Sequence, residues 1–455
     1  MKHKALIIII LLFSLPAFAQ QKTSFSLREA TDYALQHNVG VRKADNEVLK
    51  AKKKVWETTA MGFPNISAQS TYQKFLKQPV NLLPARIFNP HAPADQYIPV
   101  KFGTEQSMKW GLQWNQLIFS GSYITGLYSS RTYKKISELA AVKTRQKIRE
   151  AVTRAYANAL LTDESLQILQ NNIDVVENNL FEVRQMYKNG LVEETDVEQL
   201  EITLAQLKNQ KDYMQRLHDT AYEMLNYVMG RNPDDALVLT DDLESLYKQA
   251  ADLKLLQARL KPENNIDYKM AKNKVKAGKL QVRFQQSQFL PTIAGFVTYG
   301  KNAYNNDFKF FDKDQNWYEQ SVLGISINIP VFNGFVKHKK VGQARLDYEN
   351  AKMDFENTRR KLAIDFKRLQ NEYEHSLNEV NTARQNWELA RKIERKEQIK
   401  FKEGVGNSFQ LAQARMQLYA MQQNYLKALT DVLTKKTELE NFLGENQETN
   451  KSNQQ

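Results

Sequence analysis

The sequence contains no cysteine among its 455 residues. It therefore has no disulfide framework and no thiol that could carry a lipid anchor at a mature N-terminus. Histidine is also scarce: the six residues are scattered, without H-E-x-x-H spacing, and no phosphate-binding G-x-x-x-x-G-K-[ST] motif occurs. These absences count against an enzyme built on a nucleophile, a metal or a nucleotide, so we expect no catalytic, metal or cofactor site.

Long apolar runs are missing beyond the first twenty residues, MKHKALIIIILLFSLPAFAQ. That segment joins Lys2 and Lys4 to an apolar run and an A-x-A site at residues 17–19, the pattern of a secretory signal peptide. We expect residues 1–19 to be removed and the mature chain to be exported. Because no later run approaches the roughly 20 apolar residues of a spanning helix, any membrane crossing would have to use strands, which hydropathy detects poorly.

Acidic residues are fewer than basic ones, 51 against 64, which gives a formal net charge of +13. A basic balance can indicate nucleic acid or an anionic surface. Here the lysines and arginines are spread along helical segments rather than gathered with aromatics, and the chain is expected to be exported. We therefore expect no nucleic-acid partner.

An internal duplication organises the rest of the chain. QLIFSG at 116–121 and IPVFNG at 329–334 share one plan, and their glycines lie 213 residues apart. YKNG (187–190) and FKEG (401–404), and likewise YVMG (227–230) and NFLG (441–444), repeat at an offset of 214. FPNISAQSTY (63–72) and LPTIAGFVTY (290–299) are offset by 227, so copy one carries 14 extra residues (227 − 213) between its strands. The Pro-rich stretch 79–99 is predicted to be a long surface loop.

The duplication predicts two repeats with the same order of elements. The first, 20–230, contains a helix over 27–60, a β-hairpin over 64–119 and long helices over 121–188 and 194–230. The second, 263–444, contains a helix over 265–288, a hairpin over 291–332 and long helices over 335–403 and 408–443. Residues 231–262 are expected to form an inter-repeat region of a mixed equatorial domain, and 445–455 a polar, disordered tail.

Apolar and polar residues alternate in four segments, as in half-buried strands. One face is predicted to collect Ile66, Ala68 and Tyr72; Met108, Trp110, Leu112 and Trp114; Ile293, Val297 and Tyr299; and Leu323, Ile325, Ile327 and Ile329. Residues 121–187 contain no proline, enough for a helix of about 100 Å at roughly 1.5 Å per residue. The apolar stripe on such rods is narrow, which favours coiled-coil packing.

Four strands of bilayer length cannot close a membrane barrel, whose smallest examples have about eight. Several chains must therefore pool their strands. Two chains would give eight strands and an interior filled by side chains, whereas three would give twelve and room for an open lumen.

The duplication and its motifs together resemble the TolC-like outer-membrane efflux protein family. The motifs are LIFSG and PVFNG at the strand-to-helix junctions, YKNGLVEETDVEQLEITLAQLKNQ (187–210), FKEGVGNSFQLAQARMQLYAMQQNYL (401–426) and MGRNPD (229–234). The resemblance covers nearly the whole mature chain. It implies a mainly α fold with membrane β: a long antiparallel α-helical barrel and four β-strands per chain, contributing to a trimeric 12-stranded β-barrel. It further implies a homotrimer in the lipid of the outer membrane of a Gram-negative bacterium.

In function the resemblance implies a passive exit duct of a tripartite efflux or type I secretion system, joined by a periplasmic adaptor (membrane fusion) protein to an inner-membrane transporter. It places adaptor-docking tips at the two helix turns, and constriction residues of a periplasmic gate in the helices that follow. The gate candidates are Asp196, Gln199, Gln410 and Gln413. The docking candidates are Gly190, Leu191, Val192, Gly404, Val405 and Gly406.

Two further sets of residues follow from the strands. Pro64 and Pro291 mark the change from helix to strand, and Gly121 and Gly334 are expected to provide the sharp turn from strand to helix. An aromatic girdle at the membrane interface is expected from Tyr72, Trp110, Trp114 and Tyr299.

A different class, a periplasmic coiled-coil scaffold or adaptor without a pore, stays open as the alternative. The alternating strands discriminate against it, because a scaffold does not need four bilayer-length segments with aromatics on one face. The exported substrate, whether drug, metal ion or protein, is not determined by this chain, because that choice belongs largely to the pump.

Overall fold

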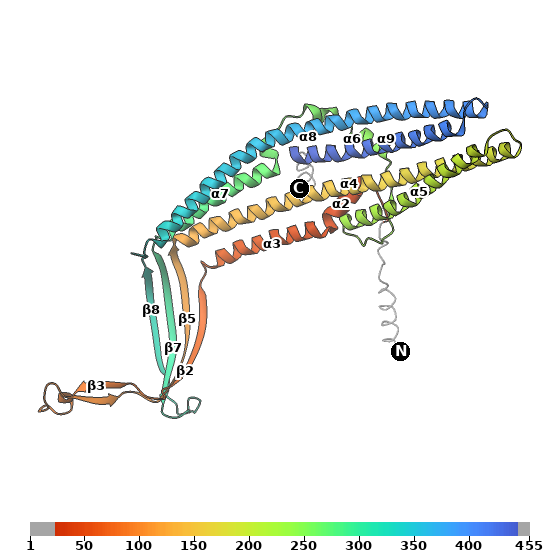
Figure 1. Ribbon diagram of the computed structural model, residues 1–455. Helices are drawn as coiled ribbons and strands as arrows, with labels where there is room; N and C mark the ends of the chain where they lie inside the picture. The colour runs from red at the N-terminus through yellow and green to blue at the C-terminus, as the bar shows by residue number, and fades with distance from the viewer. Residues whose placement is uncertain (1–22, 445–455) are drawn as a thin grey trace, which may run out of the picture. The chain divides into compact units, whose positions relative to one another are not determined.

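The computed structural model describes residues 23–444 (Figure 1), so the predicted signal peptide and polar tail lie outside the described residues. The chain forms two compact units. One comprises Met1–Val48, Ser137–Lys272 and Phe355–Gln455, and its described residues are mainly helical. The other comprises Leu49–Ile136 and Asn273–Asp354, and contains the membrane-length strands. Each is described separately below.

The second unit is built on a four-stranded antiparallel sheet with the order β2-β5-β7-β8. The strands are β2 (Asn65–Lys74), β5 (Gln106–Ser120), β7 (Thr292–Asn305) and β8 (Tyr318–Asn328). The two repeats meet at the centre, where β5 of the first pairs with β7 of the second. Figure 1 shows these four strands side by side, and it follows that β2 and β8 are the edges.

The register places on one face the apolar residues that the alternation singled out within β2, β5, β7 and β8. Trp114 pairs with Ile66 and Val297, and Val297 in turn pairs with Leu323. Because directly paired residues point to the same side of a sheet, the apolar sets of all four strands coincide. The opposite face carries mainly small and polar side chains, including Ser67, Gln69, Thr71, Gln113, Asn115 and Thr298, with Phe296 and Val322 as apolar exceptions.

The Pro-rich insertion of the first hairpin differs from the predicted loop. Within it, β3 (Val80–Pro84) pairs with β4 (Tyr97–Lys101), and a 3₁₀ turn, η1 (Ala85–Ile87), follows β3. The loop prediction was therefore wrong in part: prolines at strand ends and edges are compatible with a two-stranded ribbon, because neither ribbon strand needs all of its N–H groups.

The junction glycines serve two different purposes. Gly334 has a left-handed φ of 62°, as expected of a sharp turn. Gly121 does not, because β5 runs directly into α4 (Gly121–Lys188). A Cβ atom at Gly121 would lie 2.6 Å from Leu290 Cδ1 and 3.1 Å from the Ser287 carbonyl oxygen. The turn prediction was wrong for Gly121, where close packing, not backbone angle, requires glycine.

The helical unit is dominated by two antiparallel pairs of long helices, α4 with α5 (Glu194–Met229), and α8 (Val336–Lys402) with α9 (Ser408–Leu443) (Figure 1). Their main core contains Val152, Tyr156 and Leu160 of α4, Tyr373 of α8 and Leu429 of α9, all buried. Smaller apolar clusters continue along the rods towards the turns. No helix within residues 23–444 has the length and apolar character needed to cross a membrane.

The first helix of repeat one is interrupted, contrary to the prediction of one helix over 27–60. It divides at Asn38 into α2 (Leu27–His37) and α3 (Val39–Ala60), because Asn38 has an extended backbone. The Asn38 amide accepts the Gly40 N–H (2.7 Å) and donates to the Val228 carbonyl (2.7 Å). Asn265, just before α7 (Ile266–Ser287), repeats both bonds, with the Asp267 N–H (2.8 Å) and the Phe442 carbonyl (2.9 Å).

The segment between the repeats packs on the helical core. It contains β6 (Val238–Leu239), parallel to β1 (Ser24–Phe25), then α6 (Leu243–Ala250), η2 (Leu253–Gln257) and η3 (Pro262–Asn264). Two buried tyrosines hold it: Tyr156 donates to Asp241 Oδ2 (3.1 Å), and Tyr373 donates to the Ala250 carbonyl (2.7 Å). We call this region, together with the C-terminal ends of α5 and α9, the waist.

Candidate gate and docking surface at the helix turns

The turns between the long helices have the same backbone in both repeats. Gly190 (φ 70°) follows α4 and Gly404 (φ 70°) follows α8. Leu191 N–H donates to the Met186 carbonyl (2.9 Å), and Val405 N–H donates to the Lys400 carbonyl (3.0 Å). Bonds of this kind satisfy carbonyls that a helix end leaves unpaired, and they require a left-handed residue, which glycine provides.

The surroundings of both glycines are open. A Cβ atom on Gly190 or Gly404 would meet no atom within 4 Å, so only the backbone angle requires glycine there. Beside them Leu191 and Val405 are 69% and 78% exposed, and Phe409 is 57% exposed. Val192, in contrast, packs against the small core of Leu180, Val183 and Leu200. The turns thus combine a fixed backbone with exposed apolar side chains.

Asp196 joins the two turns. Its Oδ1 accepts a hydrogen bond from Ser408 Oγ (2.5 Å) and lies 3.3 Å from the Ser408 amide nitrogen, which also donates. Its Oδ2 accepts from the Glu193 N–H (3.3 Å) at the start of α5. Ser408 is the first residue of α9 and is 3% exposed. One carboxylate therefore serves the N-terminal ends of α5 and α9 together.

Electrostatics favour a carboxylate at this position. Unpaired N–H groups give a helix N-terminus a partial positive charge, and a nearby anion stabilises it by about 0.3–1 kcal/mol. Asp196 contacts two such ends. At α9, Asn407 completes the capping by accepting the Gln410 N–H (2.8 Å).

The gate candidates separate into two groups. Asp196 and Gln199 both line a cavity of about 510 Å³ between the turns, together with Phe401, Ser408 and the tip glycines 404 and 406. Gln410 and Gln413 are exposed on α9 and do not line this cavity. Sequence reasoning missed Ser408, which lies 212 residues from Asp196. Its one signal was its place directly after the capping residue Asn407.

A second polar contact lies further along the same helices. Arg415 of α9 is 8% exposed, and its Nε donates to Glu394 Oε1 of α8 (3.3 Å). Burial lowers the pKa of the Arg415 guanidinium, and the neighbouring Glu394 carboxylate opposes that shift. Within the described chain, Nη1 and Nη2 of Arg415 have no protein partner, and Arg415 is among the residues that line a cavity of about 150 Å³. Pattern analysis gave no sign of this buried ion pair.

The predicted girdle residues occupy different surroundings. Trp110 and Trp114 are half-buried on the apolar face of the sheet, and the Trp110 ring lies edge-on to Tyr299 (6.0 Å between centroids). Tyr72 instead contacts the β7–β8 connection: its ring packs on Phe308 and Phe310, and its hydroxyl donates to Gln106 Oε1 (2.8 Å). Pro64 and Pro291 directly precede β2 and β7, where helix gives way to strand.

Comparison with known proteins agrees with this architecture. Residues 259–445 match the model of the outer membrane efflux protein family. Outer membrane protein TolC of Vibrio cholerae is 20% identical over 348 residues, covering 73% of this chain and 76% of that protein. Among solved structures, VceC of Vibrio cholerae superposes with a TM-score of 0.70 at 17% identity, covering 92% of this chain and 96% of VceC. CmeC of Campylobacter jejuni gives a TM-score of 0.70 at 14% identity, covering 92% and 85%.

The duplicated chain, with its two pairs of long helices and four-stranded sheet, therefore has the fold of the outer-membrane proteins VceC and CmeC. The family match over residues 259–445 and the similarity to TolC support a location in the outer membrane and a function as an exit duct. The predicted fold class, function and location are thereby confirmed. The family consists of efflux channels and not of enzymes.

Proposed function

We propose that this chain assembles as a homotrimer, forming a passive, non-catalytic duct that an inner-membrane pump and a periplasmic adaptor complete. The sheet carries the proposal. Its edges β2 and β8 are unpaired within the described chain, and one of its faces is apolar whereas the other is mainly polar. In lipid every backbone polar group must be paired, so the edges need partner strands. Three copies pool twelve strands, with the polar face towards a lumen.

Oligomeric state and conductance test the assembly. Detergent-purified protein is expected to have the mass of a trimer and to give discrete current steps in a planar bilayer. A monodisperse monomer without conductance would favour the alternative, a scaffold without a pore.

We infer that the open apolar surface at the turns, formed by Leu191, Val405 and Phe409, is where the adaptor docks. Exposed apolar patches with a fixed backbone are typical of protein interfaces. Val405→Asp is expected to reduce capture of the adaptor in a pull-down while the trimer stays intact. Unchanged capture would remove this surface from the interface.

We also propose that Asp196 holds the gate closed by joining the starts of α5 and α9, with Gln199, Gln410 and Gln413 as further constriction residues. Asp196→Ala removes its bonds to the Glu193 N–H and to Ser408, a loss of about 1–2 kcal/mol. Basal open probability is then expected to rise about tenfold.

Single-channel recording measures this effect, and Glu194→Ala is the matched control, because it removes a neighbouring acid from the same helical turn. Ser408→Ala should raise the open probability in the same direction. A closed Asp196→Ala channel would exclude Asp196 from the gate.

A further inference from the structure

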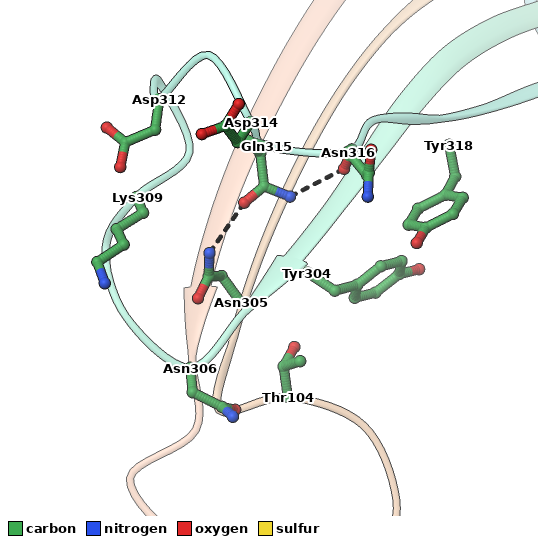
Figure 2. Close-up of a pocket in the computed structure, with 10 residues that line it drawn as sticks. All are labelled: Thr104, Tyr304, Asn305, Asn306, Lys309, Asp312, Asp314, Gln315, Asn316 and Tyr318. Atoms are coloured by element: carbon green, nitrogen blue, oxygen red, sulfur yellow. Dashed lines mark hydrogen bonds between the residues drawn. The ribbon is translucent and has the colours of Figure 1, made fainter.

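A cavity of about 890 Å³ lies at the connection between β7 and β8, at the end of the sheet away from the helix junctions (Figures 1 and 2). Its size lies in the range of small-molecule sites, roughly 300–1,000 Å³. We call it the mouth cup. Its lining includes Tyr304, Asn305, Lys309, Gln315, Asn316 and Tyr318.

Two tyrosines form one side of the mouth cup. Tyr304 pairs with Ser107, and Tyr318 pairs with Asn302, so both project from the polar face of the sheet. Their ring centroids are 6.3 Å apart at an interplanar angle of 43°, and they are 46% and 59% exposed. Figure 2 shows the two rings beside each other. Each presents an apolar ring face together with a polar hydroxyl.

Amide side chains form the centre of the mouth cup and are held in place. Asn305 Nδ2 donates to Gln315 Oε1 (2.9 Å), and Gln315 Nε2 donates to the Asn316 carbonyl (2.8 Å), as the dashed lines of Figure 2 show. The Asp307 N–H donates to Asn305 Oδ1 (3.1 Å). Amides fixed in this way offer donors and acceptors to a ligand at a reduced entropic cost.

The connection itself is anchored. Phe310, in the middle of this exposed segment, is only 1% exposed, because its ring packs against Phe308 and Tyr72. The hydroxyl of Tyr72 is held by Gln106, whose side-chain nitrogen donates to the Asn306 carbonyl (2.9 Å). The mouth cup is therefore largely formed before any ligand arrives.

The charges of the lining argue against a polyanionic ligand. Lys309 contributes one positive charge and Asp312 and Asp314 contribute two negative ones, a sum of −1. Moreover, Lys309 lies 3.3 Å from Asp307, which partly neutralises it. Carboxylates and amides bind hydroxyl groups well, whereas a phosphate-rich ligand would need an excess of cationic donors.

We propose that the mouth cup binds a neutral saccharide. A sugar ring has an apolar C–H face, which suits the tyrosines, and a rim of hydroxyls, which suits the amides and carboxylates. The proposal rests on the proposed function for orientation, since in the assembled duct the cup would lie at the outer mouth of the lumen. Its ligand would be either a glycan of the cell surface or a free saccharide at the mouth.

Tryptophan fluorescence of the purified trimer tests the proposal, since Trp317 is adjacent to Tyr318 in the sequence. Loss of the fluorescence change in Trp317→Phe shows that the change arises from Trp317. The two probes are maltohexaose and the neutral fraction of the lipid-free oligosaccharide released from the outer-membrane glycolipid of the producing bacterium. We expect a saturable change with at least one of them. Maltohexaose alone would indicate a free saccharide, and the glycolipid oligosaccharide would indicate a resident surface glycan.

Tyr304→Ala and Tyr318→Ala are each expected to weaken binding about tenfold, whereas Tyr318→Phe keeps the ring and most of the affinity. Tyr97→Ala, an exposed tyrosine of β4 outside the cup, is the matched control and should change nothing. The proposal is overturned if neither saccharide changes the fluorescence, or if calcium chloride, added as a separate ligand, is the only addition that changes it. It is also overturned if the double variant, with both Tyr304→Ala and Tyr318→Ala, binds saccharide like the parent. Trimer mass and conductance, measured on the same samples, report separately on the duct.

Discussion

Helices α5 and α9 each run between two glycine turns, and the two ends of these helices differ in what surrounds the glycine. At the tips, Gly190 and Gly404 have left-handed φ and empty space around them. At the waist, Gly230 (φ 84°) and Gly444 (φ 78°) have the same backbone, but a Cβ atom would lie 2.7 Å from the His37 carbonyl oxygen and 2.6 Å from the Asn264 carbonyl oxygen. The same turn is therefore a packed joint at one end and an open surface at the other.

The packed waist and the open tips are suited to different roles. At the waist, Asn38 binds the end of α5 within repeat one, and Asn265 binds the end of α9 within repeat two. Buried Tyr373 holds the segment between the repeats, and backbone segments touch at Gly230 and Gly444. The tips are connected chiefly by Asp196 and a small apolar core. A duct that opens at one end needs a rigid region from which the helices can move, and loosely connected turns that can separate.

The largest expected effect is at the waist. Gly230→Ala places a methyl group against the backbone of His37 and Asn38 in an unfavourable φ region. Backbone cannot move aside as a flexible side chain can, so we expect a loss of about 3 kcal/mol or more. Guanidinium unfolding of the purified protein measures it, with Gly190→Ala as the control. Equal losses at the two sites would remove the distinction between waist and tip.

An intermediate effect is expected from alkaline pH at the waist. Tyr425 of α9 donates to the Glu244 carboxylate of α6 and accepts from Arg384 Nη2 (2.7 Å). Burial, with Glu244 beside it, raises the pKa of Tyr425 to about 12. Because the folded-state pKa lies above the ordinary value, this stabilisation is complete below about pH 10 and is lost as pH rises through 12.

The measurement compares the parent with Tyr425→Phe across pH 8 to 12. The stability advantage of the parent should stay constant to about pH 10 and then shrink by up to about 3 kcal/mol, because the pKa is raised from 10.0 to about 12. Tyr213→Phe, an exposed tyrosine of α5, controls for the general effect of alkali. An advantage that does not change with pH would show that the hydroxyl of Tyr425 is not tied to the waist in this way.

The smallest effect is expected at the tips. Gly404→Ala has room for its methyl group and meets only the unfavourable φ, a cost of about 1 kcal/mol. Gly404→Asn should cost less, because asparagine accepts the left-handed region more readily. Unfolding midpoints of the two variants test this order. A collapse of the trimer in Gly404→Ala would mean that the turn is packed in the assembly.

Much of the fold could be predicted because its signals are local. The alternation in Met108, Trp110, Leu112 and Trp114 requires one apolar face, whatever strand lies alongside. Unbroken runs of helix-forming residues predicted α4 and α8 to within a residue or two. The helix break at Asn38 was not predicted, because Asn38 is held by a hydrogen bond to the Val228 carbonyl, 190 residues away in the sequence. The two-stranded ribbon in the insertion was not predicted, because the prolines of this stretch indicated a loop rather than two short strands.

Less of the candidate site at the helix turns could be predicted from the sequence. Asp196 was singled out by a resemblance, but its partner Ser408 was not, since a serine after a helix cap is common. Asp196 aligns with Gln410, and Glu193 with Asn407, at the repeat offset of 214. The duplication thus predicts two similar turns, but not that the carboxylate of one would bind the start of the helix after the other.

By itself, the sequence determined what depends on near neighbours along the chain: the duplication, the lengths of the rods, the apolar face of each strand and the glycines at the turns. Periodicity and backbone angle are local properties, so they can be read without a partner. Only the tertiary structure decided which turns are packed and which are open, which residue meets Asp196, and that the β7–β8 connection encloses a cup. Those properties depend largely on contacts between segments distant in the sequence, such as Asp196 with Ser408 (212 residues apart) and Gln106 with Asn306 (200 residues apart). Composition and spacing do not indicate which distant segments meet.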